Sequence, residues 1–160
     1  MPYTLKVEGM ETITVALAKA GDAAPGIAAA ALYEGAGVIA DEISRQARGL
    51  ETSRFRYANG WQRKPSPEEK EALVSAGAAG IAKFQQTGNS VNTSVGYGRS
   101  GYATVNGKTK PVAVIANAIN SGTSFMKKQP FIRKAVSQSK NKATEAITKK
   151  VEQMVSEIMK

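Results

Sequence analysis

The sequence predicts an α+β fold in which a small antiparallel sheet has a long N-terminal helix and a long C-terminal helix packed against it. Apolar residues recur with a helical period over residues 22–48 and again over residues 131–160. Between these segments lie short runs of β-branched residues and an Asn-Gly dipeptide, which are typical of strands and a hairpin turn. The length of 160 residues is that of one ordinary domain, so we expect residues 1–160 to form a single domain.

The first helix is predicted to begin at Asp22, whose side chain can act as N-cap, with Pro25 tolerated in the first turn. Gly49 is predicted to end it near Arg48. Gly35 and Gly37 weaken the helix, but because they lack a side chain they allow another backbone to approach closely. Its apolar positions, at near-helical spacing, are Ile27, Ala31, Leu32, Val38, Ile39 and Ile43.

Residues 49–86 are predicted to be an insertion or loop region. Its first part contains arginine and aromatic side chains, which dominate binding hot spots. We therefore expect this loop to contact a partner or another subunit; the alternative is that its aromatic side chains fill the core. The predicted contact residues of the loop are Arg54, Phe55, Arg56, Tyr57 and Trp61.

A capping box marks the start of a short helix inside this region. Ser66 is predicted to be the N-cap, Pro67 the first helical residue and Glu69 the third, so that Ser66 and Glu69 satisfy each other's backbone N–H groups. The Ala- and Gly-rich run 76–82 has no clear period and is interpreted as a tight or mobile connection.

The centre of the chain predicts the strands. Residues 89–97 combine β-branched side chains with partial alternation, which favours a strand. Residues 102–105 and a following extended piece flank Asn106-Gly107, the dipeptide that best supplies the positive φ angles of a two-residue hairpin turn. The apolar run 111–120 fits either a strand or a helix; we favour a short helix, which Gly122 would end.

Residues 131–160 contain no Gly or Pro, and their apolar residues recur at spacings of three and four, which predicts an amphipathic helix. Over its full length this helix would measure about 45 Å, more than a small domain covers by itself. We therefore expect its distal half to pack against another subunit through Val151, Met154 and Ile158. The alternative is a frayed C-terminal tail.

The net charge of +9 belongs to one region of the chain, since no carboxylate lies between Glu71 and Glu145. The basic residues of that region are interleaved with aromatic ones, which suits a nucleic-acid surface. The alternatives are a solvated face and a basic face that meets an acidic face of a partner protein. The basic residues are Lys83, Arg99, Lys108, Lys110, Lys127, Lys128, Arg133, Lys134, Lys140 and Lys142.

The composition argues against catalysis. Cysteine and histidine are absent, which removes thiolate nucleophiles and the commonest general base and nitrogen metal ligand. Residues 96–101 match the GxGxxG of dinucleotide-binding turns, but no helix pattern follows and no carboxylate lies about twenty residues further on. We expect no enzymatic activity, no catalytic residue, no cofactor and no metal.

The lack of a signal-peptide pattern and of a long apolar run leads us to expect a soluble protein made in the cytoplasm. The first residues lack the apolar segment of a signal peptide. Gly, Asp, Arg or Lys interrupts each apolar run before it reaches the length that spans a bilayer, so no membrane partner is expected.

The second half of the chain contains a motif in two parts. Residues 116–124 read Ala-Asn-Ala-Ile-Asn-Ser-Gly-Thr-Ser, and residues 129–135 read Gln-Pro-Phe-Ile-Arg-Lys-Ala. This pattern resembles the tail-component family of long-tailed, siphovirus-type bacteriophages, in which a Gly-Thr element precedes a Pro-Phe-aliphatic-Arg-x-Ala start of the last helix. The first helix and Thr87-Gly88 also resemble the family, although Asn89 and Ser90 stand where it often has an aliphatic residue. The motif residues are Thr87, Gly88, Gly122, Thr123, Pro130, Phe131, Arg133 and Ala135.

The resemblance implies a virion structural protein, one that completes the tail or joins head to tail in the neck, without a catalytic residue. Its partners would be neighbouring phage neck and tail proteins and further copies of itself in a ring, hexameric by family resemblance, with packaged DNA passing the lumen. It would be located in the neck or tail of the virion, and in the host cytoplasm during assembly. The alternative function is a basic nucleic-acid-binding module.

Overall fold

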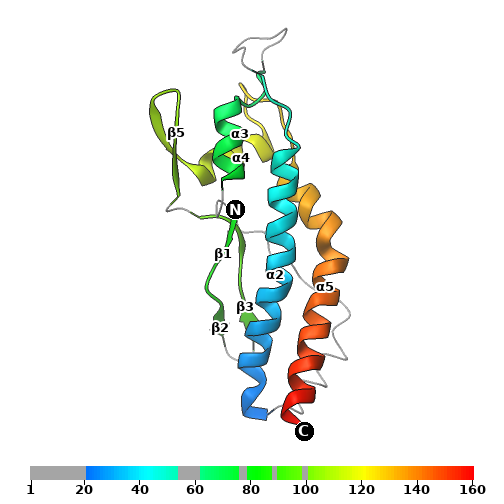
Figure 1. Cartoon of the computed structure of the whole chain (residues 1–160). Helices are drawn as coiled ribbons and strands as arrows, with labels where there is room; N and C mark the ends of the chain where they lie inside the picture. The colour runs from blue at the N-terminus through cyan, green and yellow to red at the C-terminus, as the bar shows by residue number, and fades with distance from the viewer. Residues whose placement is uncertain (1–20, 54–61, 76–78, 88–89, 99–100) are drawn as a thin grey trace. The chain divides into compact units, whose positions relative to one another are not determined.

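The computed structural model describes residues 21–53, 62–75, 79–87, 90–98 and 101–160 (Figure 1). The fold is α+β, as the sequence predicts, with a long helix near each end of the described chain and short strands between them. In chain order the elements are η1 (Gly21–Ala23), α2 (Ala24–Arg48), α3 (Pro67–Val74), β1 (Ala79–Ile81), β2 (Gln85–Thr87), β3 (Ser90–Asn92), β4 (Val95–Tyr97), β5 (Tyr102–Val105), β6 (Lys108–Pro111), α4 (Val112–Ser121) and α5 (Phe131–Ile158).

Contacts divide the chain into two compact units. The junction unit, as we name it, comprises Ala40–Gly80 and Gly96–Gln138; the helix-pair unit comprises Ile81–Val95, Ser139–Lys160 and the described part of Pro2–Ile39. Helices α2 and α5 each supply residues to both units, and we describe each unit by itself. The expectation of a single domain over residues 1–160 stays a prediction.

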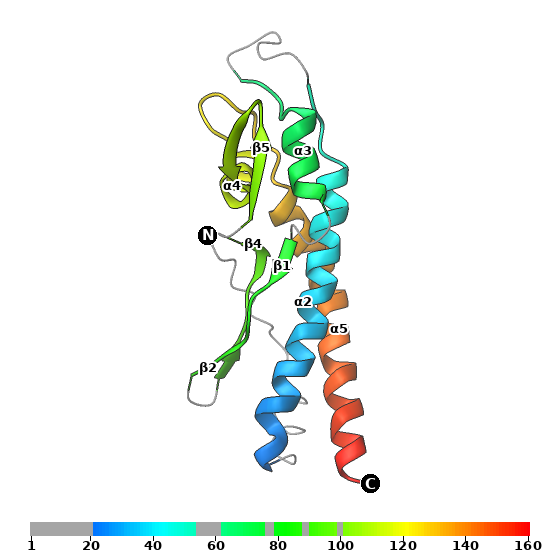
Figure 2. The same cartoon turned by 60° about the vertical axis from the view of Figure 1, so that its left-hand side comes forward.

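In the helix-pair unit, the first part of α2 and the distal part of α5 lie side by side and antiparallel (Figures 1 and 2). The two helices are amphipathic, and their apolar faces meet in a common core. An ion pair joins them at the surface, with Lys150 Nζ 3.9 Å from Glu34 Oε1. The buried core residues are Ile27, Ala31, Ile147, Val151 and Val155, with Leu32 and Met154 packed against them.

This core corrects the role predicted for the distal part of α5. Val151 is 1% exposed and Met154 packs against the same cluster, so the chain itself covers two side chains that we assigned to a partner. The reason is that α2, at 25 residues, is long enough to lie along the apolar face of α5. Ile158 is 52% exposed and stays a predicted contact residue. The predicted helix itself is confirmed as α5, not a frayed tail.

The close approach of the two helices depends on Gly35, as predicted. A Cβ atom on Gly35 would lie 2.5 Å from Cγ1 of Ile147 and 3.2 Å from the backbone oxygen of Ala143. On Gly37 a Cβ atom would meet nothing within 4 Å, so packing among the described residues requires only the first of the two glycines.

The described strands form two-stranded ribbons, in which β1 pairs with β4, β2 with β3 and β5 with β6. The strand predicted over residues 89–97 is therefore divided into β3 and β4. At the break between β3 and β4, the Thr93 hydroxyl donates to the Ala82 carbonyl at 2.6 Å. The Ala82 carbonyl thus has a hydrogen-bond partner outside the β-ladders. Residues 79–81, which we interpreted as part of a connection, form β1.

Asp22, predicted as the N-cap of the first helix, lies inside η1, and α2 begins at Ala24. Three other predicted local structures are confirmed. Asn106 (φ 52°) and Gly107 (φ 73°) make the tight turn between β5 and β6, which pair antiparallel with Val105 opposite Lys108. Helix α4 follows Pro111, and Gly122 (φ 76°) caps its C-terminus. At the start of α3, both hydrogen bonds of the capping box are present.

Helix α2 corrects the expectation that every apolar run is too short for a bilayer. Together with η1 it spans Gly21–Arg48, 28 residues with a mean hydropathy of 1.3 in its most apolar window, which suffices by length and composition to cross a membrane. Alanine is the reason, because many small apolar residues raise the mean without forming an uninterrupted run. A core helix of a soluble protein meets the same criterion, and Ile27, Ala31 and Ile43 of α2 are buried here.

We predict that Gly35→Ala lowers the free energy of unfolding by about 1–3 kcal/mol, because the added methyl group overpacks the contact with Ile147 and Ala143. The matched control is Gly37→Ala in the same helix, which should raise it by about 0.5–1 kcal/mol, since it removes a helical glycine without a clash. Urea unfolding followed by circular dichroism measures both. Equal effects of the two changes would contradict the close approach at Gly35.

Candidate functional site

The six motif residues between Gly122 and Ala135 come together at one place, the loop between α4 and α5 and the first turn of α5. We call residues 120–135 the α4–α5 junction; all of it belongs to the junction unit. Of the other motif residues, Thr87 lies in β2, where it pairs with Ser90, and Gly88 lies outside the described residues. The junction is therefore the candidate functional site.

Gly122 and Thr123 make the turn that leaves α4. The Gly122 N–H donates to the Ala118 carbonyl at 2.9 Å, and a Cβ atom on Gly122 would lie 3.2 Å from Cα of Lys128, so both its positive φ and its tight surroundings favour glycine. The Thr123 hydroxyl accepts from the backbone N–H groups of Phe125 (3.2 Å) and Met126 (2.9 Å). The Thr123 N–H donates in return to the Met126 carbonyl at 3.0 Å. These hydrogen bonds close the loop on itself.

Asn120, in the last turn of α4, caps the N-terminus of α5. Its side chain is buried, and Oδ1 accepts from the backbone N–H groups of Ile132 (3.1 Å) and Arg133 (3.4 Å). The first N–H groups of a helix have no partner within it, so this one oxygen stabilises the start of α5 from another element. Just before it, the Gln129 N–H donates to the Ile119 carbonyl at 2.8 Å.

Phe131 and Ala135 anchor the first turns of α5, as the motif leads us to expect. Phe131 is 4% exposed and Ala135 is fully buried. The Phe131 ring lies 6.1 Å from the ring of Tyr97 in β4, centroid to centroid and tilted by 56°. Burial raises the pKa of Tyr97, whose hydroxyl donates to the Leu73 carbonyl at 3.3 Å and so stays protonated.

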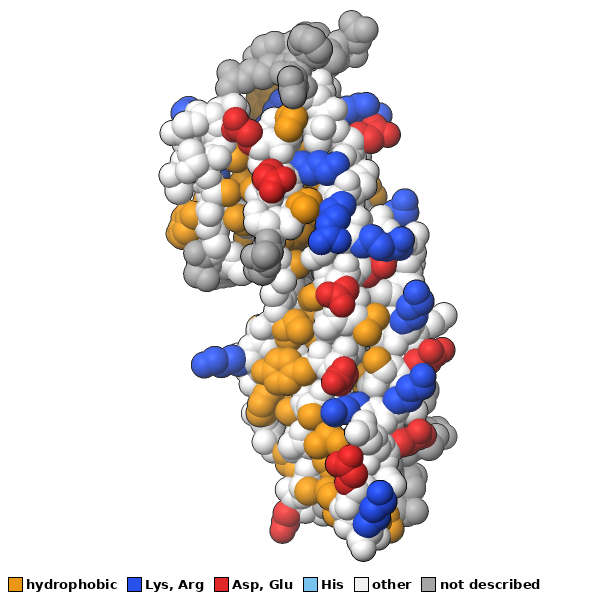
Figure 3. All heavy atoms as spheres, in the orientation of Figure 1, with side chains coloured by type: hydrophobic (Ala, Val, Ile, Leu, Met, Phe, Trp, Pro, Cys, Tyr) orange, Lys and Arg blue, Asp and Glu red, His pale blue; other side chains and the backbone are white. Residues whose placement is uncertain are grey.

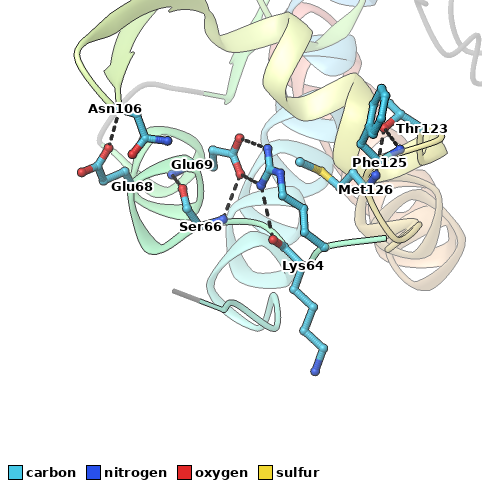
Figure 4. A network of polar contacts seen from close by, with 9 residues as sticks. Lys64, Ser66, Glu68, Glu69, Asn106, Thr123, Phe125 and Met126 are labelled. Carbon is cyan, nitrogen blue, oxygen red and sulfur yellow. Dashed lines mark hydrogen bonds and ion pairs between the residues drawn. The ribbon is translucent and has the colours of Figure 1, made fainter. Parts of the chain in front are cut away.

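A second segment, residues 62–69, holds the loop in place. The Arg63 N–H donates to the Phe125 carbonyl (2.7 Å), and the Arg63 carbonyl accepts from the Lys127 N–H (2.9 Å), so Arg63 pairs with Met126 as in a parallel bridge. The side chain of Gln62 donates to the Thr123 carbonyl at 3.0 Å. Figure 4 shows how this pairing lies beside the start of α3.

The guanidinium of Arg63 connects the loop to the capping box of α3. It donates to both carboxylate oxygens of Glu69, each at 2.8 Å, while Glu69 also accepts from the Ser66 N–H at 2.9 Å (Figure 4). Burial alone would raise the pKa of Glu69, but the hydrogen bonds from Arg63 and Ser66, with the positive charges of Arg63 and Lys110, hold it below the ordinary value of 4.5. Such a bidentate pair fixes both orientation and distance.

Gln129 fixes the end of the loop through a reciprocal pair of hydrogen bonds. Its side-chain oxygen accepts from the Glu51 N–H, and its side-chain nitrogen donates to the Glu51 carbonyl, both at 3.0 Å. The α4–α5 junction is therefore held at residues 51, 63 and 120. Most backbone N–H groups of residues 122–129 are hydrogen-bonded within the protein, which holds the loop in one arrangement and makes it a rigid surface.

One large apolar side chain of this rigid loop points outward. Phe125 is 75% exposed although its backbone N–H and carbonyl are both bonded. A fixed, exposed aromatic side chain is typical of a binding anchor. The loop predicted as a contact surface, Arg54, Phe55, Arg56, Tyr57 and Trp61, lies outside the described residues, and its role stays a prediction.

Residues 120–135 contain basic side chains and no carboxylate. On the segments that hold them, the Glu69 carboxylate accepts from Arg63 and Ser66, and the Glu51 carboxylate pairs with Lys64. Within the described ranges, Asp and Glu residues form no group of three that could hold a metal ion. Comparisons with protein-family models, with curated proteins and with solved structures find no match for this chain.

Sequence reasoning missed Asn120, Arg63 and Gln129, which hold the junction together. Asn120 had a signal, because a polar residue that closes an apolar helical run is expected to be buried and therefore to need a partner. Arg63 and Gln129 had none, since their partners are distant in sequence and any exposed loop contains such residues.

We predict that Asn120→Ala lowers the free energy of unfolding by about 1–2 kcal/mol, because two N–H groups at the start of α5 lose their acceptor. Asn117→Ala is the matched control on the exposed side of α4 and should change it by less than about 0.5 kcal/mol. Chemical denaturation measures both, and equal losses would show that Asn120 does not cap α5.

We predict that Glu69→Gln lowers the free energy of unfolding at neutral pH by about 2 kcal/mol, since it leaves the part-buried Arg63 without its ion pair. Because folding lowers the pKa of Glu69, its stabilisation is present above pH 4.5 and is lost as pH falls through the folded value. The difference between the two proteins should therefore shrink below pH 4.5. Glu71→Gln, exposed in the same helix, is the control; a pH-independent difference at Glu69 would refute the linkage.

Proposed function

We propose that the chain is a structural subunit of the head–tail joint or tail terminus of a long-tailed bacteriophage. It assembles there as a ring that connects or completes the tail. Its partners are further copies of the chain, six in the ring by family resemblance, and neighbouring neck and tail proteins. The subunit is made in the host cytoplasm, resides in the neck or tail of the virion and performs no catalysis.

The observation that supports this proposal is the structural role of the motif residues between Gly122 and Ala135. Gly122, Thr123, Phe131 and Ala135 each have a distinct structural task in the α4–α5 junction: a tight turn, loop closure, and two buried anchors. These tasks maintain one shape and supply no reactive group. A protein whose distinguishing residues preserve a rigid loop is suited to assembly, where many copies must present the same surface.

Exposed apolar side chains supply candidate contacts for that ring. Phe125 lies on the junction loop, Ile158 (52% exposed) is the last residue of α5, and Met159 (67%) follows it. A ring repeats one contact between two different surfaces, so separate apolar patches on the same subunit suit it. Each patch is small, which favours a subunit that folds alone and joins others during particle assembly.

The proposal is tested by deleting the gene from the phage or prophage that encodes it. Loss of a joint or terminator should leave DNA-filled heads and separate or overlong tails in electron micrographs. Antibody raised against the chain should label the neck or tail end of intact particles. Normal infectious particles in the deletion strain would refute the proposed function.

A point variant then tests the contact. Phe125→Ser should leave the unfolding midpoint of the isolated subunit unchanged, since the phenyl side chain is exposed. It should reduce incorporation into particles at least about tenfold. Tyr102→Ser removes another exposed aromatic ring from the junction unit, outside the α4–α5 junction, and serves as the matched control. If both variants, or neither, reduce incorporation, Phe125 is not a specific contact.

A further inference from the structure

We infer that a basic segment of the α4–α5 junction binds the phosphate backbone of duplex DNA, without regard to base sequence. The segment consists of Lys127, Lys128, Arg133 and Lys134. The inference names DNA as a partner, and the role of this binding in the particle rests on the proposed function. Binding itself is a property of the isolated chain and is tested there.

The charge of the basic segment is not neutralised within the part of the chain that is described. All four side chains are exposed, and none forms an ion pair with a described carboxylate. Three other basic residues of the junction unit do form ion pairs, whereas Arg48, Lys70, Lys108 and Lys110 form none with a described carboxylate. Arg45 pairs with Glu42, Arg63 with Glu69 and Lys64 with Glu51.

The carboxylate of Glu51 interacts electrostatically with Lys127 of this segment, but it does not neutralise the charge of the segment. The hydrogen bond and charge of Lys64 chiefly lower the pKa of Glu51, with a smaller contribution from Lys127. Because Lys64 Nζ lies 2.9 Å from Glu51 Oε2, that negative charge is already balanced. Lys127 adds a second positive charge to the same place.

The backbone of the segment is fixed before any partner arrives. The Lys127 N–H is bonded to Arg63, the side chain of Gln129 to the backbone of Glu51, and the Arg133 N–H to Asn120. Pre-ordering lowers the entropy lost on binding, so four cations on such a backbone bind a charged ligand better than the same four on a flexible tail.

The position of Arg133 and Lys134 points to a role in binding. Both lie in the first turn of α5, which contains no acidic residue. The N-terminus of a helix has a partial positive charge, so cations there destabilise it, where acidic residues would stabilise it. A negatively charged partner at this surface removes that disadvantage.

A nucleic acid fits the segment better than a protein. Lysine is depleted in the cores of protein interfaces, which need apolar area. Contacts with phosphates instead use lysine and arginine together with polar side chains, and Ser137 and Gln138, exposed on the next turn of α5, are of that kind. On the face in Figure 3, acidic side chains are scattered among basic ones and form no separate acidic patch.

The test measures fluorescence anisotropy of a labelled duplex with the full chain. Four phosphate contacts predict a slope of about −3.6 in log K against log salt, or roughly 100-fold weaker binding at 200 mM than at 50 mM salt. Replacing the four basic residues by Gln should weaken binding at low salt at least about tenfold and flatten the slope. The control variant replaces Lys83, Lys140, Lys142 and Lys149, also exposed, by Gln, and so has the same net charge.

Each outcome decides the inference. It is supported if the segment variant loses affinity, the control variant keeps it within about threefold, and two duplexes of unrelated sequence bind alike. Three results with DNA would overturn it: equal losses in both variants, no binding by the wild-type chain at low salt, or a strong sequence preference. Displacement of the DNA by polyglutamate at equal charge would also overturn it. Phe125→Ser should bind DNA normally, so failure of the particle assay and failure of DNA binding are distinguishable.

Discussion

The start of α5 depends on one buried oxygen atom, Oδ1 of Asn120. It accepts from Ile132 and Arg133 and so fixes the residue at which the helix begins. A helix repeats every 3.6 residues, so positions four apart drift by about 40° and the buried side of α5 winds around the helix. In α5, buried residues recur at every fourth position: Phe131, Ala135, Ser139, Ala143, Ile147, Val151 and Val155.

This row gives the two units their common dependence on α5. Its first residues complete the junction unit beside Tyr97, and its last pack against α2 in the helix-pair unit. The middle of the row consists of small residues, Ala135, Ser139 and Ala143, and Gly35 of α2 meets α5 at Ala143 and Ile147. Small side chains let helices approach closely, which compensates for the modest area that alanine buries.

Local signals in the sequence predicted the elements well, because each such signal acts over a few residues. The capping box at Ser66, the Asn106-Gly107 turn and the glycine that ends α4 need only neighbours to form. The division of 89–97 into two strands could not be predicted in this way, since Thr93 bonds to Ala82, eleven residues earlier.

Only the part of the candidate site that depends on neighbouring residues was predicted from the sequence. The motif identified Gly122, Thr123, Phe131 and Ala135, whose tasks are local to the turn and to the entry of the helix. It could not identify Arg63, which bonds to Phe125 and Lys127 across about sixty residues of sequence. Long-range hydrogen bonds leave no periodic trace in a single sequence.

The burial of Val151 limits what the proposed contact between subunits can consist of. Because α2 covers the apolar row of α5 as far as Val155, that row stabilises the subunit itself and has no surface left for a neighbour. The large apolar side chains that stay exposed are Val114, Phe125 and the control position Tyr102 in the junction unit, the contacting pair Tyr33 and Phe84 in the helix-pair unit, and Ile158 and Met159 near the end of the chain. Small patches of this kind bind weakly one at a time. In a closed ring each subunit makes its contact twice, once with each neighbour, so contacts too weak to hold a dimer still hold the assembly once the ring is complete.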